Sequence, residues 1–308
     1  MKLFVVEGDN LKLVRSNPFK TEKELQQMVE RNVNELFGLE FVQTELPIRN
    51  FRLDTLCFDK ETNLFVIIEY KKGTNYSVID QGYTYLSLLL NNKSDFVLEY
   101  NERMEGSLRR NDVDWSQSRI IFISPQFTDY QKHSINFQDV PFELWEVKRF
   151  EDGNMSFNQY KPSSTVSITT ISSDKKTVVN EVSKVVKRYD EEYILNKSKE
   201  RTTEFKEFYY NLRNRVLEFG DVEVKVNGKF ISLHRDNKPF VDFIIYRNRI
   251  GININLKKGE LKDDLGKSED QSDKQHWGSG DYIIWIDHND DLEYVISLIK
   301  QSYQKQGD

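Results

Sequence analysis

The segment that most constrains the fold of this chain spans residues 52–85, where charged side chains interrupt runs suited to a buried sheet. Its first run, residues 51–58, is β-prone but contains Asp54, and a polar turn follows. Residues 64–68 then form an almost purely apolar strand. Because it is apolar throughout, we expect this strand to be central in its sheet and not at an edge.

The apolar strand ends in Glu69, Tyr70 and Lys71. Strand side chains alternate between faces, so Glu69 and Lys71 share a face, and a hairpin can place Asp54 opposite them. A charge left there without a partner costs several kcal/mol. The convergence of these groups therefore predicts a functional site, and a bound divalent metal ion would account for it.

The composition is that of a folded protein with more than one domain. At 308 residues two domains are expected, and 38% hydrophobic and 13% aromatic residues are enough for real cores. The net charge of −6 excludes a globally basic nucleic-acid coat. It does not exclude DNA as a substrate, because an enzyme can concentrate positive charge locally.

The cysteine content favours a reducing compartment, and the hydropathy indicates no membrane span. The single cysteine, Cys57, excludes an internal disulfide, and we expect it to be a buried structural thiol. No apolar run approaches the about 20 residues of a membrane span. The first residues become charged too early for a signal peptide. We therefore expect a cytoplasmic protein without a membrane partner.

Hydrophobic periodicity predicts a mixed α/β sandwich in the N-terminal half. Two short strands come first, and a helix then begins at Thr21 and ends at Gly38. The elements expected next are strands over residues 41–48, 51–58 and 64–68, a helix over residues 76–91, and strands over residues 95–100, 119–124 and 142–150.

The second half predicts a smaller α+β domain behind a linker. Residues 160–180 are rich in Ser, Thr and Lys, and residues 182–219 have helical spacing. Five strands and a closing helix then follow. We therefore predict domains over residues 1–160 and 201–308, with a partly helical linker over residues 161–200.

The charged groups after the apolar strand fit the chemistry of phosphodiester hydrolysis. Mg²⁺, or Mn²⁺ in its place, takes oxygen ligands, and Asp54, Glu69 and the carbonyl of Tyr70 can supply them. Lys71 is placed to orient or deprotonate a water molecule and to offset charge on the phosphate. Gln81 and Tyr85, four residues apart on a helix, share a face from which they can hold the water or a phosphate oxygen.

The spacing of these residues resembles that of the PD-(D/E)xK nuclease superfamily, and it is closest to the RecB-like and mismatch-endonuclease branch. The resemblance covers roughly residues 15–150, including the Glu22-Lys-Glu-Leu-Gln segment. It implies a restriction-endonuclease-like mixed sheet flanked by helices, and a metal-dependent DNA hydrolase with catalytic Asp54, Glu69 and Lys71. The signature proline is absent, since Leu53 precedes Asp54.

The same resemblance implies an acidic residue on the first helix. Glu22 is the position carried over, and Glu24 and Glu30 are close alternatives. Such a nuclease would act in DNA repair, restriction or defence. It could work alone, as a homodimer, or as a subunit of a complex.

Other interpretations of the charged segment remain open. Glu69 and Lys71 could pair at a solvent-facing hairpin end, for at most about 1 kcal/mol. The chain could also be a non-catalytic module that binds nucleic acid or a protein partner on a nuclease fold.

The C-terminal half has its own unusual segment, residues 275–282, in which two glycines flank a serine before a strand. With residues 238–242 and the closing helix, it resembles a small domain of unknown function found attached to such nucleases, in bacterial proteins labelled predicted transport proteins. The sequence offers no membrane-crossing segment to support transport. The four histidines are too far apart in the sequence for a recognisable zinc motif.

Overall fold

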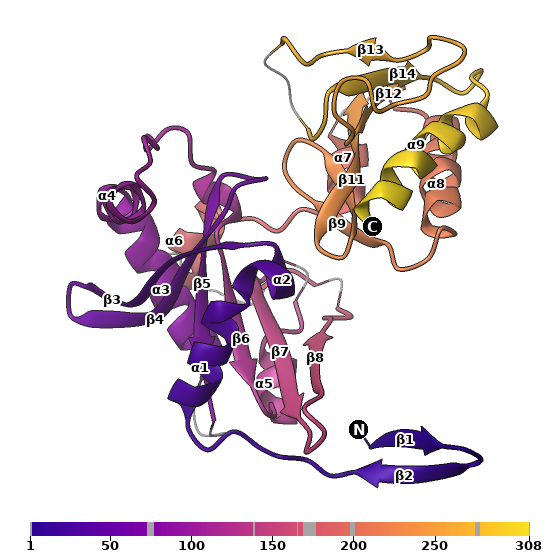
Figure 1. Cartoon of the computed structure of the whole chain (residues 1–308). Coiled ribbons are helices and arrows are strands. Elements are labelled where there is room, and N and C mark those ends of the chain that lie inside the picture. The colour runs from indigo at the N-terminus through magenta and orange to yellow at the C-terminus, as the bar shows by residue number, and fades with distance from the viewer. Residues whose placement is uncertain are drawn as a thin grey trace. The chain divides into compact units, whose positions relative to one another are not determined.

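The computed structural model describes residues 2–72, 77–137, 139–164, 166–168, 177–197, 201–274 and 278–307. The chain divides into two compact units, Met1–Arg188 and Tyr189–Asp308. Each has its own six-stranded sheet and its own hydrophobic core (Figure 1). No helix among the described residues is long and apolar enough to cross a membrane.

The N-terminal unit is built on a mixed sheet in the order β3-β4-β5-β6-β7-β8. The pairs β5–β6 and β6–β7 are parallel, and the outer pairs are antiparallel. The apolar strand is central, as expected, because β5 lies between β4 and β6. The bounds are β3 Glu40–Ile48, β4 Phe51–Asp59, β5 Leu64–Tyr70, β6 Arg119–Ser124, β7 Phe142–Arg149 and β8 Met155–Tyr160.

Helices cover both faces of this sheet (Figure 1). Helices α1 (Glu22–Arg31) and α2 (Val33–Phe37) pack on the face that carries Cys57 and Ile68. The other face is covered by α3 (Val78–Asn91), α4 (Lys93–Met104), α5 (Asp129–Ser134) and α6 (Val178–Val185). Cys57 is fully buried, and burial raises the pKa of its thiol, in agreement with a structural role.

The first helix begins and ends where the sequence predicts, but Asn32 divides it in two. The Thr21 hydroxyl accepts the N–H of Glu24 and caps α1. Gly38 follows α2 with a φ of +67°, a left-handed conformation that glycine adopts without strain.

The strand expected over residues 95–100 is wrong, because α4 occupies this position. Alternation would bury Phe96, Leu98 and Tyr100 together. In the helix Phe96 and Tyr100, four residues apart, both pack toward Phe65, whereas Leu98 is 57% exposed. The four-residue spacing of the two rings, which suits a helix, therefore prevails over the strand-like alternation of the three apolar residues. Strand β8 was also not predicted.

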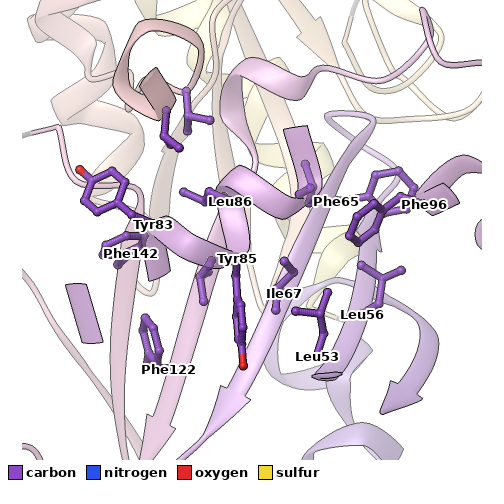
Figure 2. Close-up of a cluster of buried hydrophobic side chains, with 14 of the residues drawn as sticks. Leu53, Leu56, Phe65, Ile67, Tyr83, Tyr85, Leu86, Phe96, Phe122 and Phe142 are labelled. Atoms are coloured by element: carbon purple, nitrogen blue, oxygen red, sulfur yellow. The ribbon is translucent and has the colours of Figure 1, made fainter. Parts of the chain in front are cut away.

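Helix α3 packs unusually close to the sheet at Gly82. A Cβ atom at this position would lie 2.5 Å from Cζ of Phe142 on β7. Figure 2 shows Tyr83, Tyr85 and Leu86 of this helix beside Phe122, Phe142 and Ile67 in one apolar cluster. The close approach brings the residue before Gly82, Gln81, to the end of β5.

The C-terminal unit is an antiparallel sheet in the order β13-β14-β12-β11-β10-β9. Its core lies between the sheet and the helices α8 (Thr203–Leu217) and α9 (Leu292–Gln306), and α7 (Glu191–Asn196) precedes them. The bounds of the strands are β9 Glu223–Val226, β10 Ile231–Arg235, β11 Lys238–Tyr246, β12 Arg249–Ile254, β13 Glu269–Asp270 and β14 Tyr282–Ile286. The five strands expected in this half are all present, and β13 is additional.

The two short strands expected at the N-terminus form a separate hairpin of β1 (Leu3–Glu7) and β2 (Asn10–Val14). It pairs with no other strand among the described residues. The chain then rejoins the large sheet at Ser16, which forms a bridge with Phe150.

The close packing at Gly82 is testable. We expect Gly82→Ala to lower the free energy of unfolding by about 1–2 kcal/mol, because the clash with Phe142 outweighs alanine's better helix propensity. Ser87→Ala on the same helix is the control and should change stability little. Urea denaturation followed by circular dichroism measures both, and a Gly82→Ala variant as stable as the parent would contradict the packing.

Candidate active site

The pairing of β4 with β5 brings the two predicted carboxylates together. Thr55 pairs with Ile68, so the next positions along the hairpin, Asp54 and Glu69, are neighbours on the α3 face of the sheet. Asp54 is fixed further by its carboxylate, which accepts the backbone N–H of Tyr70 at 3.0 Å. The expected hairpin geometry is therefore present at the end of the central strand.

Glu69 is the centre of the site. Glu69 is only 2% exposed. Its Oε1 accepts hydrogen bonds from Lys71 Nζ at 2.7 Å and from Gln81 Nε2 at 2.5 Å. The hydroxyl of Tyr85 lies 3.5 Å from the same oxygen. The second oxygen, Oε2, is buried without a hydrogen-bond partner among the described residues. A buried carboxylate oxygen without a donor is costly unless another group binds it.

Burial raises the pKa of both carboxyls. Burial, followed by the charge of Asp54, raises the pKa of Glu69 to about 7, against the lowering effect of Lys71. Burial also raises the pKa of Asp54, although the Tyr70 N–H and Lys71 oppose it. Two close acids with raised pKa values are expected where a cation is to be bound.

The α3 side chains close the site from above the sheet. Gln81 Nε2 also lies 2.9 Å from the Tyr85 hydroxyl, so the two residues act as a connected pair. Figure 2 shows the Tyr85 ring within the apolar cluster with its hydroxyl at the outer end. Burial, and then the charge of Glu69, raises the pKa of Tyr85 to about 12, so the hydroxyl stays protonated and able to donate near neutral pH.

The three glutamates of the first helix have different surroundings. Glu22 accepts the backbone N–H of Lys72 at 2.7 Å, directly after the site lysine, and its charge is among the causes that raise the pKa of Asp54. Glu24 instead accepts from Arg149 and from the N–H of Lys20. Glu22 therefore lies at the site, and Glu24 lies at the attachment of α1 to β7.

Glu30, the third glutamate, belongs to a polar network beneath the site that the sequence analysis missed. Its carboxylate accepts from the Thr55 hydroxyl at 2.7 Å and from Gln26 Nε2 at 2.9 Å. Gln26 also lies 2.9 Å from the carbonyl of Asp54, and Thr55 lies 3.3 Å from the Tyr70 hydroxyl.

This network joins α1 to both strands of the hairpin, on the opposite face from the carboxylates. Thr55 and Tyr70 are the neighbours in sequence of Asp54 and Glu69, so the network holds the strands of both carboxylates from the opposite face. The available signal was Gln26, a polar residue directly beside the apolar stripe of α1 and only 4% exposed.

The residues present fit a divalent metal ion with oxygen ligands. Asp54 and Glu69 supply carboxylates, and Glu69 Oε2 receives no hydrogen bond from a donor in the part of the chain that the structure describes. Among the described residues, no group of three or more His, Cys, Asp and Glu side chains is close enough to form a metal cage. Two carboxylates with water and substrate oxygens are the usual arrangement for Mg²⁺, and a zinc site has no basis here.

The unusual C-terminal segment covers a row of polar side chains on the sheet. Asp242 is fully buried, and its carboxylate accepts from the Ser232 hydroxyl and the Ser279 N–H, both at 2.5 Å. Gly278, with a φ of +95°, passes so close to Asn253 that a Cβ atom would lie 2.0 Å from its Nδ2. Gln275, His276 and Trp277 lie outside the described residues.

Solved structures with some likeness to this chain include nucleases. A repair endonuclease from Pyrococcus abyssi is 16% identical with a TM-score of 0.26, over 44% of this chain and 60% of that one. The EndoMS-dsDNA2 complex is 15% identical with a TM-score of 0.27, over 47% and 64%. SfsA from Pyrococcus furiosus in complex with Ca²⁺ is 13% identical with a TM-score of 0.24, over 48% and 75%. Likeness at this level assigns no activity.

Sequence comparison relates this chain to a domain family and to a full-length relative. Residues 190–306 match a family model described as Domain of unknown function (DUF5655), a description that does not mention transport. A protein from Haemophilus influenzae named "Uncharacterized protein" is 40% identical over 304 residues, which cover 98% of this chain and 99% of that protein. The chain therefore belongs to the same family as this Haemophilus influenzae protein.

Proposed function

We propose that the N-terminal unit is a metal-dependent nuclease that hydrolyses phosphodiester bonds of DNA, with Mg²⁺ or Mn²⁺ as cofactor. The observation that carries the proposal is the buried Glu69 carboxylate, which has one oxygen held by Lys71 and Gln81 and the other without a partner, beside Asp54. The superfamily resemblance of the same residues supports DNA as the substrate.

In this proposal Asp54 and Glu69 hold the metal ion, and the Tyr70 carbonyl adds an oxygen. When bound, the ion would polarise the scissile phosphate and lower the pKa of the attacking water. Lys71, fixed by Glu69 at 2.7 Å, would orient that water and balance negative charge developing on the phosphate. Gln81 and Tyr85 would donate hydrogen bonds that keep Glu69 in place, and Glu22 would complete the acidic edge.

A role without turnover is the alternative, in which the unit binds nucleic acid on the same surface. It predicts DNA binding that weakens steeply with salt and no cleavage under any metal condition. The cleavage experiments below separate the two roles.

The catalytic assignment of Lys71 predicts a large loss of activity. Lys71→Ala should lower the rate of cleavage of plasmid or single-stranded DNA by about 10²–10⁴-fold with Mg²⁺ or Mn²⁺, because charge stabilisation in the transition state is lost. Lys60→Ala is the matched control, since Lys60 lies on the same hairpin and pairs with Glu40. If the wild type and Lys71→Ala cleave at the same background rate, the nuclease assignment fails.

The raised pKa of Glu69 predicts a pH-dependent cost that metal ions should remove. The folded state holds this proton more tightly than the unfolded state, so the stability that it contributes is complete below about pH 4.5 and lost as the pH rises to about 7. In EDTA, Glu69→Gln should therefore gain stability over the wild type as the pH rises through this window.

Thermal unfolding at a series of pH values measures this difference. Adding Mn²⁺ at about pH 8 should raise the melting temperature of the wild type but not that of Glu69→Gln. Glu102→Gln, an exposed change on α4, is the control. Equal pH profiles for the wild type and Glu69→Gln would contradict the buried, strained carboxylate.

The surroundings of the first-helix glutamates predict different effects of their removal. Glu22→Gln should lower the cleavage rate by about tenfold or more, because a carboxylate at the site is lost. Glu24→Gln, which loses the ion pair to Arg149, should leave the cleavage rate nearly unchanged. Cleavage assays at saturating Mg²⁺ measure both, and a larger loss for Glu24→Gln would reverse the assignment.

A further inference from the structure

The sheet of the C-terminal unit has one face without helices, and aromatic and cationic side chains gather at one end of it. Helices α8 and α9 lie together beside the sheet (Figure 1). They pack on the opposite face, where Tyr209 contacts Phe243 and Tyr303 contacts Phe240. The face without helices is covered at Asp242 and Asn253 by Gly278 and Ser279. Farther along the same strands it carries Tyr246 and Arg249, which pair at the end of the β11–β12 hairpin, and Trp285 of β14. We call Tyr246, Arg247, Arg249 and Trp285 the hairpin platform.

The platform is ordered by close packing. Trp285 pairs with Gly251 across the sheet, and a Cβ atom on Gly251 would lie 2.9 Å from the indole ring, so glycine lets the indole approach the strand. The Arg249 guanidinium lies 4.3 Å from the centre of this ring and 5.4 Å from that of Tyr246. A guanidinium stacked in this way still presents its other face and its N–H groups to a ligand.

Among the described residues, no carboxylate lies within salt-bridge distance of Arg247 or Arg249. Asp287 follows β14 and is the position next to Arg249, because Ile250 pairs with Ile286. Its carboxylate accepts the N–H of Asn289, while Asp290 accepts the N–H of Asp287 and pairs with Lys267, and Asp291 caps α9.

One position of the hairpin tip holds an arginine in a backbone conformation that other residue types adopt more easily. Arg247 has a φ of +50°, a left-handed conformation that glycine and asparagine adopt more easily than arginine. The chain thus keeps a long cation at this tip position, exposed to solvent and 5.6 Å from the Tyr246 ring centre. A function for the charge accounts for this placement.

We propose that the hairpin platform binds single-stranded nucleic acid. Exposed rings and guanidinium planes stack on unpaired bases, while arginine N–H groups pair with backbone phosphates. Tyr246, which is 48% exposed, and the outer face of Arg249 supply the stacking surfaces, and Arg247 and Arg249 supply the positive charge. A duplex hides its base faces, so the platform selects single strands. This binding does not depend on the cleavage reaction.

The test uses the full chain with Lys71→Ala in EDTA, so that cleavage cannot interfere. Anisotropy of a fluorescent oligothymidylate should report binding that Tyr246→Ala and Arg249→Gln each weaken by about tenfold. Arg249→Gln should also reduce the slope of log K against log salt by about 0.7, the value for one lost phosphate contact on a single strand. Tyr246→Phe should retain binding, because the ring remains.

Arg235→Gln is the matched control, since Arg235 also stacks on a tyrosine, Tyr303, but donates to its carbonyl and lies beside Asp236. It should bind as the parent does. Melting temperatures confirm that each variant is folded.

Two outcomes would overturn the proposal. In the first, Tyr246→Ala and Arg249→Gln bind the oligonucleotide like the parent, which would place all binding elsewhere. In the second, polyglutamate competes as well as oligothymidylate, which would mean that the platform recognises an acidic protein by charge alone.

Discussion

The antiparallel pairing of β4 with β5 is the constraint on which the N-terminal unit depends. It sets Asp54 beside Glu69 on one face and Thr55 near Tyr70 on the other. The first face meets α3 and the second meets α1, so both helices are positioned against the same two strands. A slip of one residue would exchange the faces and bring the carboxylates into the apolar packing of α1.

Two buried carboxylates, one in each unit, differ in how their oxygens are hydrogen-bonded. Asp242 is fully buried, and donors from the neighbouring strand and the covering segment reach both of its oxygens. Glu69 is almost as buried, but its donors all converge on one oxygen. The first arrangement satisfies the charge and holds a turn in place. The second leaves one buried oxygen without a donor among the described residues, and the proposed metal ion would bind there.

Much of this could be predicted from the sequence, because the informative signals are local. The apolar run before Glu69 identified the central strand, and alternation placed Lys71 on the same face. The helical spacing of Gln81 and Tyr85 placed both toward the site. The error at residues 95–100 has a local cause too, since three apolar residues at spacing two also fit a helix that exposes the middle one. The buried hydrogen bonds of Gln26 could not be predicted from the sequence. Thr55 and Glu30 are distant from one another in the chain and meet only through the tertiary fold.

The turn between β4 and β5 is short, whereas β5 reaches its parallel neighbour β6 only through α3 and α4. Closing a short hairpin loop requires little chain entropy, and closing the crossover requires more. The two carboxylates therefore belong to the most local part of the sheet, and we expect them to meet before the helix that covers them has docked. On this order of assembly, the site would be acidic and open to water when it first forms, and its burial would be the later step.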